Sequence, residues 1–366
     1  MDDQLTHRIS QFLANRTTPR GSERAGEYAV ATTIGLVREQ NQDAALIIKA
    51  RYAGVPERDF DLAVVCDGLG GMKQGAEAAI LGLSAFAARL IRSSRASVED
   101  RLFNGLGQAN AEIFKVLRGS GGTTLSAVLI SRSGGPTICH VGDSRIYSIG
   151  PTELSQLTQD DTIGAALNKK GTTAHEARDT RLLQFVGMGD DLEAHIFHPK
   201  LGDTRAYLLT SDGAHDIPHG LLQRAVITTR QNFELARRLV QLSEFLGGLD
   251  NATVATIPSA IEIESDRPSE GLDLNLLTPW GQLNIWIPQL SDDKRAHQIE
   301  KNPQFDSSEG ANPSKDDDDR RSVPLKKTAQ KLKKTKKKAP RKDTENGDEL
   351  PLSEALEIKF PERKEE

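Results

Sequence analysis

The stretch Val64-Val65-Cys66-Asp67-Gly68-Leu69-Gly70-Gly71 is an apolar run that ends in an aspartate followed by glycines. Residues 62–66 predict a buried strand, so Asp67 places a carboxylate at the end of a rigid element. The glycines allow positive φ and let a ligand approach the main chain. A hard cation needs such a fixed oxygen donor, with a free carbonyl nearby and room for water. Taken alone, the stretch also fits an ordinary strand-ending Asp-Gly turn, so its meaning depends on the rest of the chain.

Size and composition indicate a soluble protein with a sizeable core. The chain has 366 residues, a formal net charge of -5 and 37% hydrophobic residues, enough for one large domain or two ordinary ones. Residues 1–4 lack the pattern of a signal peptide, and no apolar run is long enough to span a bilayer. We therefore expect a cytoplasmic protein. Cys66 and Cys139 lie in apolar runs and are expected to be buried, inert thiols rather than a disulfide.

The hydrophobic pattern predicts strands joined by short turns, together with a few amphipathic helices. Apolar residues recur at helical spacing over 79–91, 102–117 and 233–242, and residues 162–169 favour a short helix. Residues 1–24 are polar, and we expect them to pack loosely. Because the turns between consecutive strands are short, the strands should pair antiparallel. The predicted strands cover residues 28–34, 44–48, 62–66, 125–130, 137–141, 146–149, 206–210 and 252–257.

Aspartates recur at the ends of these predicted strands, often beside glycines. Any one of them is ordinary, but several at the same structural position predict one convergent acidic site. A lone arginine, Arg38, precedes the first of them by five residues. The aspartates are Asp43, Asp67, Asp143, Asp212 and Asp250.

These residues, taken in order, resemble the bacterial type of protein phosphatase 2C, the metal-dependent serine/threonine phosphatases. The resemblance covers roughly residues 24–258, and the ordered set is far more specific than any single motif. It implies an α+β fold, a four-layer α-β-β-α sandwich of two antiparallel sheets flanked by helices. The matching stretches are 38–43, 64–71, 122–130, 140–147, 208–213 and 250–254.

The resemblance also implies a role for each matching residue. Asp67 would bridge two divalent ions, with the Gly68 carbonyl as a further ligand and Asp43 completing the first ion's shell. Asp212 and Asp250 would hold the second side. Asp143 and Asp216 match positions tied to a third, weaker ion. Arg38 matches the arginine that grips the substrate phosphate, and a planar guanidinium can bind two phosphate oxygens at once. The implied catalytic residues are Arg38, Asp43, Asp67, Asp212 and Asp250.

The implied activity is hydrolysis of phosphoserine and phosphothreonine on proteins, by in-line attack of a metal-bridging hydroxide. Carboxylates suit two Mn2+ or Mg2+ ions, and no His/Cys cluster favours zinc. Such an enzyme would reverse the action of a partner serine/threonine kinase. The alternative is a weakly active or inactive signalling adaptor on a phosphatase fold, which recruits partners through its C-terminal extension. The retained carboxylates favour the enzyme.

The sequence departs from the family at the proposed proton donor. Leu69 and Met72 stand where relatives carry a histidine linked to protonation of the leaving group. A metal-bound water would then supply the proton, or His215 would replace the histidine. The simpler interpretation is that His215 is a loop histidine facing solvent. Asp161 also stands where relatives often have histidine, and no function is assigned to it.

The composition divides the chain into a lead-in (1–23), a phosphatase domain (24–260), a linker with an apolar segment (261–290) and a charged, disordered tail (291–366). A flap over about 160–195 is expected to shape substrate access, with Lys169, Lys170 and Arg178 as contacts to an acidic partner or as ordinary surface charges. Segment 272–290 holds both tryptophans. It predicts an extra strand on the phosphatase body or a motif that docks on a partner's sheet edge. The lysine-dense block 326–342 fits a solubilising tail better than a contact with nucleic acid or anionic lipid.

Overall fold

The computed structural model describes residues 2–69, 74–93, 95–168, 179–190, 192–200, 202–262 and 269–288. The tail expected to be disordered, residues 291–366, lies outside the described residues, as do Met72, Lys169, Lys170 and Arg178. Among the described residues, no helix has both the length and the apolar character needed to cross a bilayer.

The described residues form two sheets, and the larger has seven strands, all paired antiparallel. Its centre is the hairpin of β3 and β4, whose side chains are almost all buried because helices cover one face and the second sheet covers the other. In spatial order the strands are β13 (Gly281–Ile287), β12 (Leu272–Thr278), β3 (Asp43–Tyr52), β4 (Phe60–Asp67), β5 (Leu125–Ser131), β6 (Gly135–Val141) and β9 (His195–Phe197).

In the part of the chain that the structure describes, the second sheet has six antiparallel strands. A layer of apolar side chains from both sheets, among them Tyr28, Ala45, Val65 and Leu209, fills the space between them. In order the strands are β1 (Arg20–Ala25), β2 (Tyr28–Thr33), β11 (Ala252–Pro258), β10 (Ala206–Thr210), β7 (Arg145–Ile149) and β8 (Leu154–Gln156).

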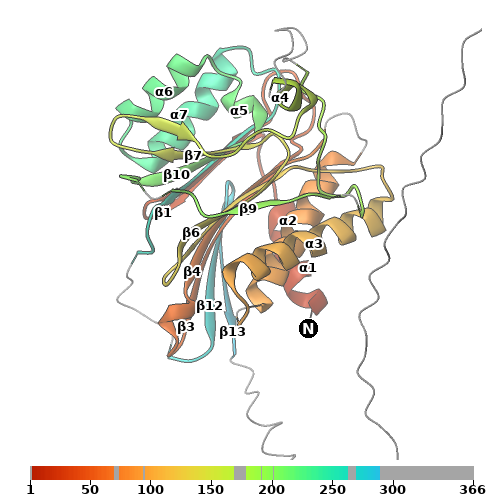
Figure 1. The fold of residues 1–366 in the computed structure, drawn as a ribbon, viewed down its shortest axis with the longest axis vertical. Coiled ribbons are helices and arrows are strands. Elements are labelled where there is room, and N and C mark those ends of the chain that lie inside the picture. The colour runs from red at the N-terminus through yellow and green to blue at the C-terminus, as the bar shows by residue number, and fades with distance from the viewer. Residues whose placement is uncertain are drawn as a thin grey trace, which may run out of the picture. The chain divides into compact units, whose positions relative to one another are not determined.

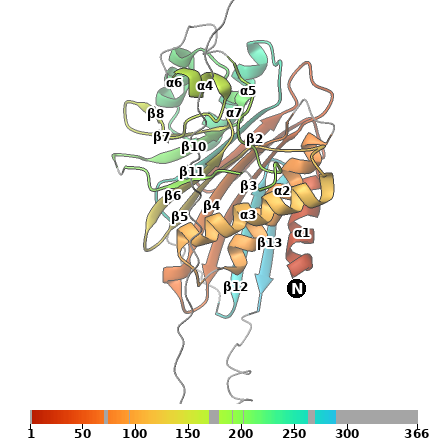
Figure 2. The ribbon, with the colours of Figure 1, turned by 45° about the vertical axis from the view of Figure 1, so that its right-hand side comes forward.

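Helices cover the outer face of each sheet, which gives the four-layer α-β-β-α sandwich that the resemblance implied (Figure 1). Figure 2 shows α1 (Asp2–Ala14), α2 (Gly75–Arg92) and α3 (Val98–Leu117) on the side of the seven-stranded sheet. The other sheet carries α5 (Asp212–His215), α6 (His219–Thr228) and α7 (Asn232–Phe245). A short helix, α4 (Ile163–Asn168), and a 3-10 turn, η1 (Pro56–Arg58), lie in connections.

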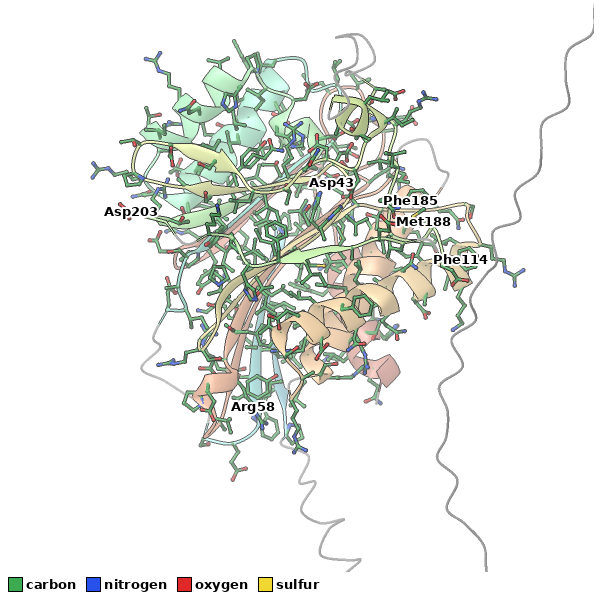
Figure 3. The ribbon with its side chains drawn as sticks, viewed as in Figure 1. Asp43, Arg58, Phe114, Phe185, Met188 and Asp203 are labelled. Atoms are coloured by element: carbon green, nitrogen blue, oxygen red, sulfur yellow. The ribbon has the colours of Figure 1, made fainter. Side chains whose placement is uncertain are left out.

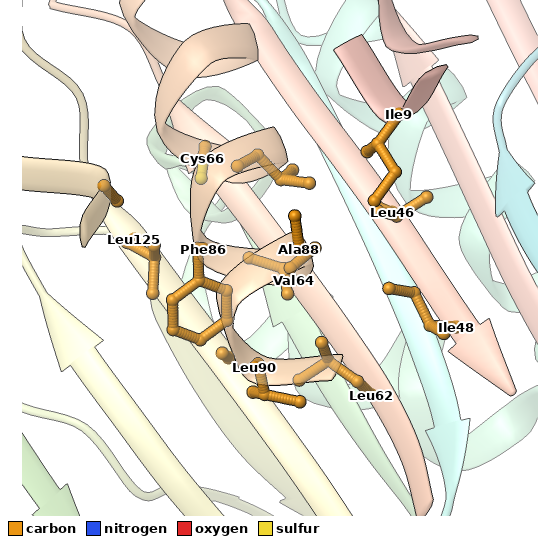
Figure 4. Packing of buried hydrophobic residues seen from close by; sticks show 14 of the residues in the cluster. Ile9, Leu46, Ile48, Leu62, Val64, Cys66, Phe86, Ala88, Leu90 and Leu125 are labelled. Carbon is orange, nitrogen blue, oxygen red and sulfur yellow. The ribbon is translucent and has the colours of Figure 1, made fainter. Parts of the chain in front are cut away.

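The expectation that residues 1–24 pack loosely is wrong. Residues 2–14 form α1, and Leu5, Ile9 and Leu13 are buried in the core beneath it. Figure 4 shows Ile9 beside Leu46 of β3. The segment then continues into β1, which pairs with β2. The segment is polar overall, but its few apolar residues recur at helical spacing and form one stripe. That stripe is enough to pack the helix against the sheet.

Segment 272–290 adds two strands to the protein's own sheet. β12 pairs with β3 and β13 pairs with β12, and Leu274 and Leu276 are fully buried. Trp280 Nε1 donates a hydrogen bond of 3.0 Å to the Thr18 carbonyl, which ties the hairpin to the chain entering β1. Of the alternatives left open for this segment, the structure shows the extra strands, so the seven-stranded sheet extends past residue 260.

Both cysteines are free and buried, as expected. Burial raises the pKa of the Cys139 thiol to about 12 and that of Cys66 beyond its usual range, so neither is a thiolate at neutral pH.

Candidate functional site

The predicted site residues lie where neighbouring strands of both sheets end. Asp43 is the first residue of β3 and Asp67 the last of β4, and the two are direct partners in the strand register. Asp212 begins α5 directly after β10, and Asp250 lies just before β11. Figure 3 shows Asp43 at the end of the sandwich opposite Arg58, which lies in the β3–β4 connection. The antiparallel pairing therefore brings carboxylates from both sheets to one end.

Asp43 is a buried carboxylate with incomplete hydrogen bonding. It is 2% exposed, and Ser211 Oγ donates a hydrogen bond of 2.8 Å to its Oδ2. The other oxygen, Oδ1, has no hydrogen-bond partner of normal geometry among the described residues. Burial is the main cause that raises the pKa of Asp43 to about 7; hydrogen bonding with Thr253 and Ser211 opposes the shift, and the charges of Asp212 and Asp250 add to it. A buried oxygen without a partner in a native site calls for a ligand.

The Asp67 backbone is held on both sides. Its N–H donates to Thr124 Oγ1 at 2.9 Å, and its carbonyl accepts from Thr124 N at 2.8 Å and Thr123 Oγ1 at 2.9 Å. Burial, followed by the charges of Asp212 and Asp43, raises the pKa of the Asp67 carboxyl well above its usual range. The Asp212 carboxyl is the charged group with the largest effect among these causes, so the two carboxyls titrate as a pair rather than independently.

Asp212 and Asp143 experience the same mutual repulsion. Burial and the nearby charge of Asp250 raise the pKa of Asp212. Burial, Asp212 and Asp160 raise the pKa of Asp143 to about 7. Like charges that raise one another's pKa must lie close together, and a cation placed among them would relieve the repulsion.

Arg38 is paired with one of the carboxylates. Its Nη2 lies 2.5 Å from Asp250 Oδ2, and both side chains are about one-third exposed. The hydrogen bond to Asp250 is the main cause that raises the pKa of Arg38, and the charges of Asp212 and Asp67 add to it. The guanidinium is therefore next to the acidic cluster, with part of its surface open to a ligand.

The carboxylate cluster fits divalent cations of the Mg2+ and Mn2+ kind. The donors are carboxylate oxygens, and the unpartnered Asp43 Oδ1 is one of them. Across the described residues, no group of three or more His, Cys, Asp or Glu side chains is arranged to hold an ion by itself. An ion at this site would thus take much of its shell from water, as Mg2+ usually does with one or two carboxylates. The assignment of individual ligands stays a prediction.

Gly68 and Asp216, two further predicted ligands, have very different surroundings. Gly68 follows Asp67 and is packed so tightly that an added Cβ would overlap the Gly75 carbonyl and lie 2.8 Å from the Gln42 carbonyl oxygen. This packing explains why only glycine fits there. Asp216 is exposed at the end of α5, and its backbone N–H donates to the Asp212 carbonyl at 2.8 Å.

His215 does not face solvent, so that interpretation was wrong. It is 8% exposed, and its Nδ1 lies 2.9 Å from Thr210 Oγ1. Burial and then the charge of Arg145 lower the pKa of His215 well below its usual value. A buried, neutral imidazole is a poor proton donor at neutral pH, so His215 does not replace the histidine that relatives carry at the positions of Leu69 and Met72.

The described parts of the flap are fastened beside Asp67. Val186 and Thr123 exchange backbone hydrogen bonds of 2.8 and 3.1 Å, and Thr123 in turn supports the Asp67 carbonyl. A cavity of about 320 Å3 is lined by flap residues, among them Asp161, Leu183 and His195. At its wall, Asp161 Oδ1 is 2.9 Å from His195 Nε2, and Asp161 Oδ2 accepts from Gly142 N at 2.9 Å. Asp161 therefore joins the flap to the loop that carries Asp143.

Three positioning residues escaped the sequence analysis. Ser211 orients Asp43, Thr124 fixes Asp67, and Asn251 Oδ1 accepts from Gln42 N at 2.8 Å and so braces the loop before Asp43. Each lies next to a motif aspartate or in a matching stretch, which was the available signal. Their partners lie 57 to 209 residues away in the chain, so sequence spacing could not reveal the contacts.

Comparison with known proteins finds the same family on sequence and on structure, although no protein-family model matches the chain. The serine/threonine protein phosphatase PstP of Mycobacterium tuberculosis is 32% identical over 241 residues, which cover 62% of this chain and 44% of PstP. The chain thus spans less than half the length of PstP. The protein phosphatase PhpP of Streptococcus pneumoniae is 27% identical over 252 residues, covering 63% of this chain and 96% of PhpP.

A solved structure supports the same relationship over a whole domain. The PPM Ser-Thr phosphatase MsPP from Mycobacterium smegmatis, in complex with cacodylate, is 30% identical with a TM-score of 0.53, over 64% of this chain and 98% of MsPP. The layers of the sandwich, the acidic end and these similarities agree. The chain therefore belongs to the PPM family of serine/threonine phosphatases.

Proposed function

We propose that this chain is a metal-dependent protein phosphatase that hydrolyses phosphoserine and phosphothreonine on proteins. The observation that carries the proposal is the meeting of four carboxylates from two sheets, with one oxygen of Asp43 left without a partner. We infer that Asp43, Asp67, Asp212 and Asp250 hold two Mn2+ or Mg2+ ions, and that Asp143 and Asp216 hold a weaker third. When bound, these ions supply charge neutralisation for the phosphate and a water of lowered pKa.

The protein's own residues orient the reactants. Arg38 offers a planar pair of donors for two phosphate oxygens, and its ion pair with Asp250 aims it at the acidic cluster. Ser211 holds Asp43 in a fixed position, and Thr124 does the same for Asp67. The free energy needed to reorganise the site when substrate binds is therefore small. His215 is buried and neutral, so it is not a suitable acid at neutral pH.

The proposed class of substrate follows from the activity that the relatives' names give. PstP and MsPP are serine/threonine phosphatases, and we infer that this chain acts on phosphoproteins in the cytoplasm and reverses the action of a serine/threonine kinase. An inactive adaptor is less favoured, because the neighbouring carboxylates raise one another's pKa, and such repulsion would only cost stability in a protein that binds no cation.

Hydrolysis of p-nitrophenyl phosphate and of a phosphothreonine peptide tests the proposal. We expect activity that requires Mn2+ or Mg2+, that is lost with chelator and restored by metal, and that Asp67→Ala abolishes. Asp203→Ala, at an exposed aspartate shown in Figure 3 far from Asp43, is the matched control and should retain full activity. A wild-type protein that stays inactive with both metals would show that the adaptor alternative is correct.

A further inference from the structure

Five large apolar side chains are exposed on two segments beside the candidate site: the loop before Arg38, and the end of α7 with the loop that follows it. Their exposed fractions run from 43% to 87%. Single exposed apolar residues are common, but a group of them on adjoining segments is typical of a binding surface. We call this group the apolar rim: Leu36, Val37, Phe245, Leu246 and Leu249.

The two loops of the apolar rim are fastened to each other. Leu36 N donates to the Gly248 carbonyl at 2.7 Å, and Asn251 Nδ2 donates to the Ile34 carbonyl at 2.9 Å. Gly35 has φ of +82°, and an added Cβ there would lie 2.7 Å from the Gly248 carbonyl oxygen. Such close approach leaves little freedom for either loop. The apolar rim is thus a preformed surface rather than a pair of loose loops.

The apolar rim is continuous with the residues proposed to bind phosphate. Val37 is followed directly by Arg38, and Leu249 by Asp250. The ion pair of 2.5 Å between Arg38 and Asp250 joins the two loops at that point. An extended chain advances about 3.3 Å per residue. A phosphorylated segment whose phosphate reaches Arg38 can therefore reach the apolar rim with residues only one or two positions away from the phosphoresidue.

We propose that the apolar rim binds apolar side chains that lie within a few residues of the phosphorylated serine or threonine. The inference rests on the proposed function, and it names the class of substrate: segments in which large apolar residues flank the phosphoresidue. The five rim residues carry no charge and no side-chain donor, so apolar contact is the interaction they offer. Burying one side chain of this size against them is worth roughly a tenfold change in affinity.

Two phosphothreonine peptides of equal length and net charge test this proposal. One carries Leu and Phe at the residues flanking the phosphothreonine, and the other carries Ser and Asn there. With Mn2+, the wild-type protein should show kcat/KM about tenfold higher for the apolar peptide, mainly through a lower KM. The double variant Phe245→Ser/Leu249→Ser should reduce that preference to about twofold or less.

Phe103→Ser is the matched control. Phe103 is 65% exposed on α3, on the other sheet's helical layer, and the variant should keep the preference of the wild type. Melting temperatures close to that of the wild type verify that each variant is folded. A preference that survives in the double variant, or an equal kcat/KM for both peptides with the wild type, overturns the proposal and leaves the phosphatase function intact.

Two further outcomes are informative. If the wild type self-associates at assay concentration, and the double variant becomes monomeric with its peptide preference unchanged, the apolar rim is an interface between copies and the proposal is wrong. If neither peptide nor p-nitrophenyl phosphate is hydrolysed with Mn2+, the proposed function fails and this inference fails with it.

Discussion

Asp43 and Asp67 are direct partners in the register of β3 and β4, so a buried and a half-buried carboxylate lie side by side at the end of a hairpin. Burial and the charge of Asp212 raise the pKa of both carboxyls, and the charge of Asp43 adds to the rise at Asp67, because burial and like charge both disfavour ionisation. This arrangement costs stability in the metal-free protein and becomes favourable only with a cation among the carboxylates.

Replacing one of these carboxylates should therefore stabilise the metal-free protein. In the presence of chelator we expect Asp67→Asn to melt about 2–4 °C above the wild type, the shift that ~1 kcal/mol produces in a domain of moderate size. Adding Mn2+ should raise the melting temperature of the wild type but not of the variant. Thermal scans with and without metal measure both effects. An undiminished metal response in Asp67→Asn would contradict the placement of the cation.

Arg38 is expected to contribute to substrate binding and little to the stability of the fold. Its ion pair with Asp250 is partly exposed, and such pairs contribute about 0–1 kcal/mol, so Arg38→Ala should change the melting temperature little. Its loss should raise KM for a phosphopeptide and lower kcat/KM by roughly 10–100-fold, since a charge-assisted bidentate contact is lost. Arg38→Lys should recover only part of this, because lysine lacks the planar pair of donors. Unchanged kinetics would remove Arg38 from the site.

Gly213 is packed against the backbone that leads from Asp250 into β11. An added Cβ would overlap the Asn251 carbonyl oxygen and lie 3.2 Å from Asp250 Cβ. Gly213→Ala should displace this backbone, cost about 1–3 kcal/mol and reduce activity. Gly220→Ala is the control, since Gly220 lies in α6 with no atom within 4 Å of the added Cβ. It should be neutral or stabilising, as alanine favours helix by up to ~1 kcal/mol. Equal melting temperatures for both variants would be the contrary result.

His140 should make the protein sensitive to acid. It is 1% exposed, and burial lowers its pKa, while Asp161 and Asp160 oppose this shift and His195 reinforces it. The unfolded chain therefore binds a proton below pH ~6.5 that the folded protein rejects, so the free energy of unfolding decreases as the pH falls from that value.

The pH slope measures this contribution. Chemical denaturation of the Mn2+-loaded wild type between pH 5 and 8 should show the decrease, and His140→Gln should flatten it by up to one proton, ~1.4 kcal/mol per pH unit. His7→Gln, on the exposed side of α1, is the surface control for the change from histidine to glutamine. A slope that is identical in His140→Gln and the wild type would assign the acid sensitivity to other groups.

The hairpin of β12 and β13 should contribute to stability. Leu276 is fully buried in the main core, whereas Trp286 is 56% exposed. Leu276→Ala should cost about 2–5 kcal/mol, the usual range for a large-to-small change in a core. Trp286→Ala should cost less than ~1 kcal/mol, as expected for a surface change. Denaturation midpoints compare the two. Comparable losses would mean that the hairpin is not anchored through its inner face.

Much of the fold followed from local patterns in the sequence. The strands over 62–66, 125–130 and 206–210 and the helices over 79–91 and 102–117 are long or strongly periodic, and the structure confirms them. Helix α1 was missed because its apolar stripe of Leu5, Ile9 and Leu13 is diluted by charged neighbours. Strands β8 and β9 are three residues each, too short for an alternating pattern to be recognised.

The sequence by itself determined that acidic residues end several strands and that their order matches one phosphatase family. Only the tertiary structure decided that Asp43 and Asp67 are register partners, that Ser211 reaches Asp43 across 168 residues, and that Asp43 keeps an oxygen without a partner. Local propensity acts over a few residues, whereas antiparallel pairing and burial bring together groups far apart in the chain. The electrostatics of the site arise from that proximity, and no spacing along the sequence encodes it.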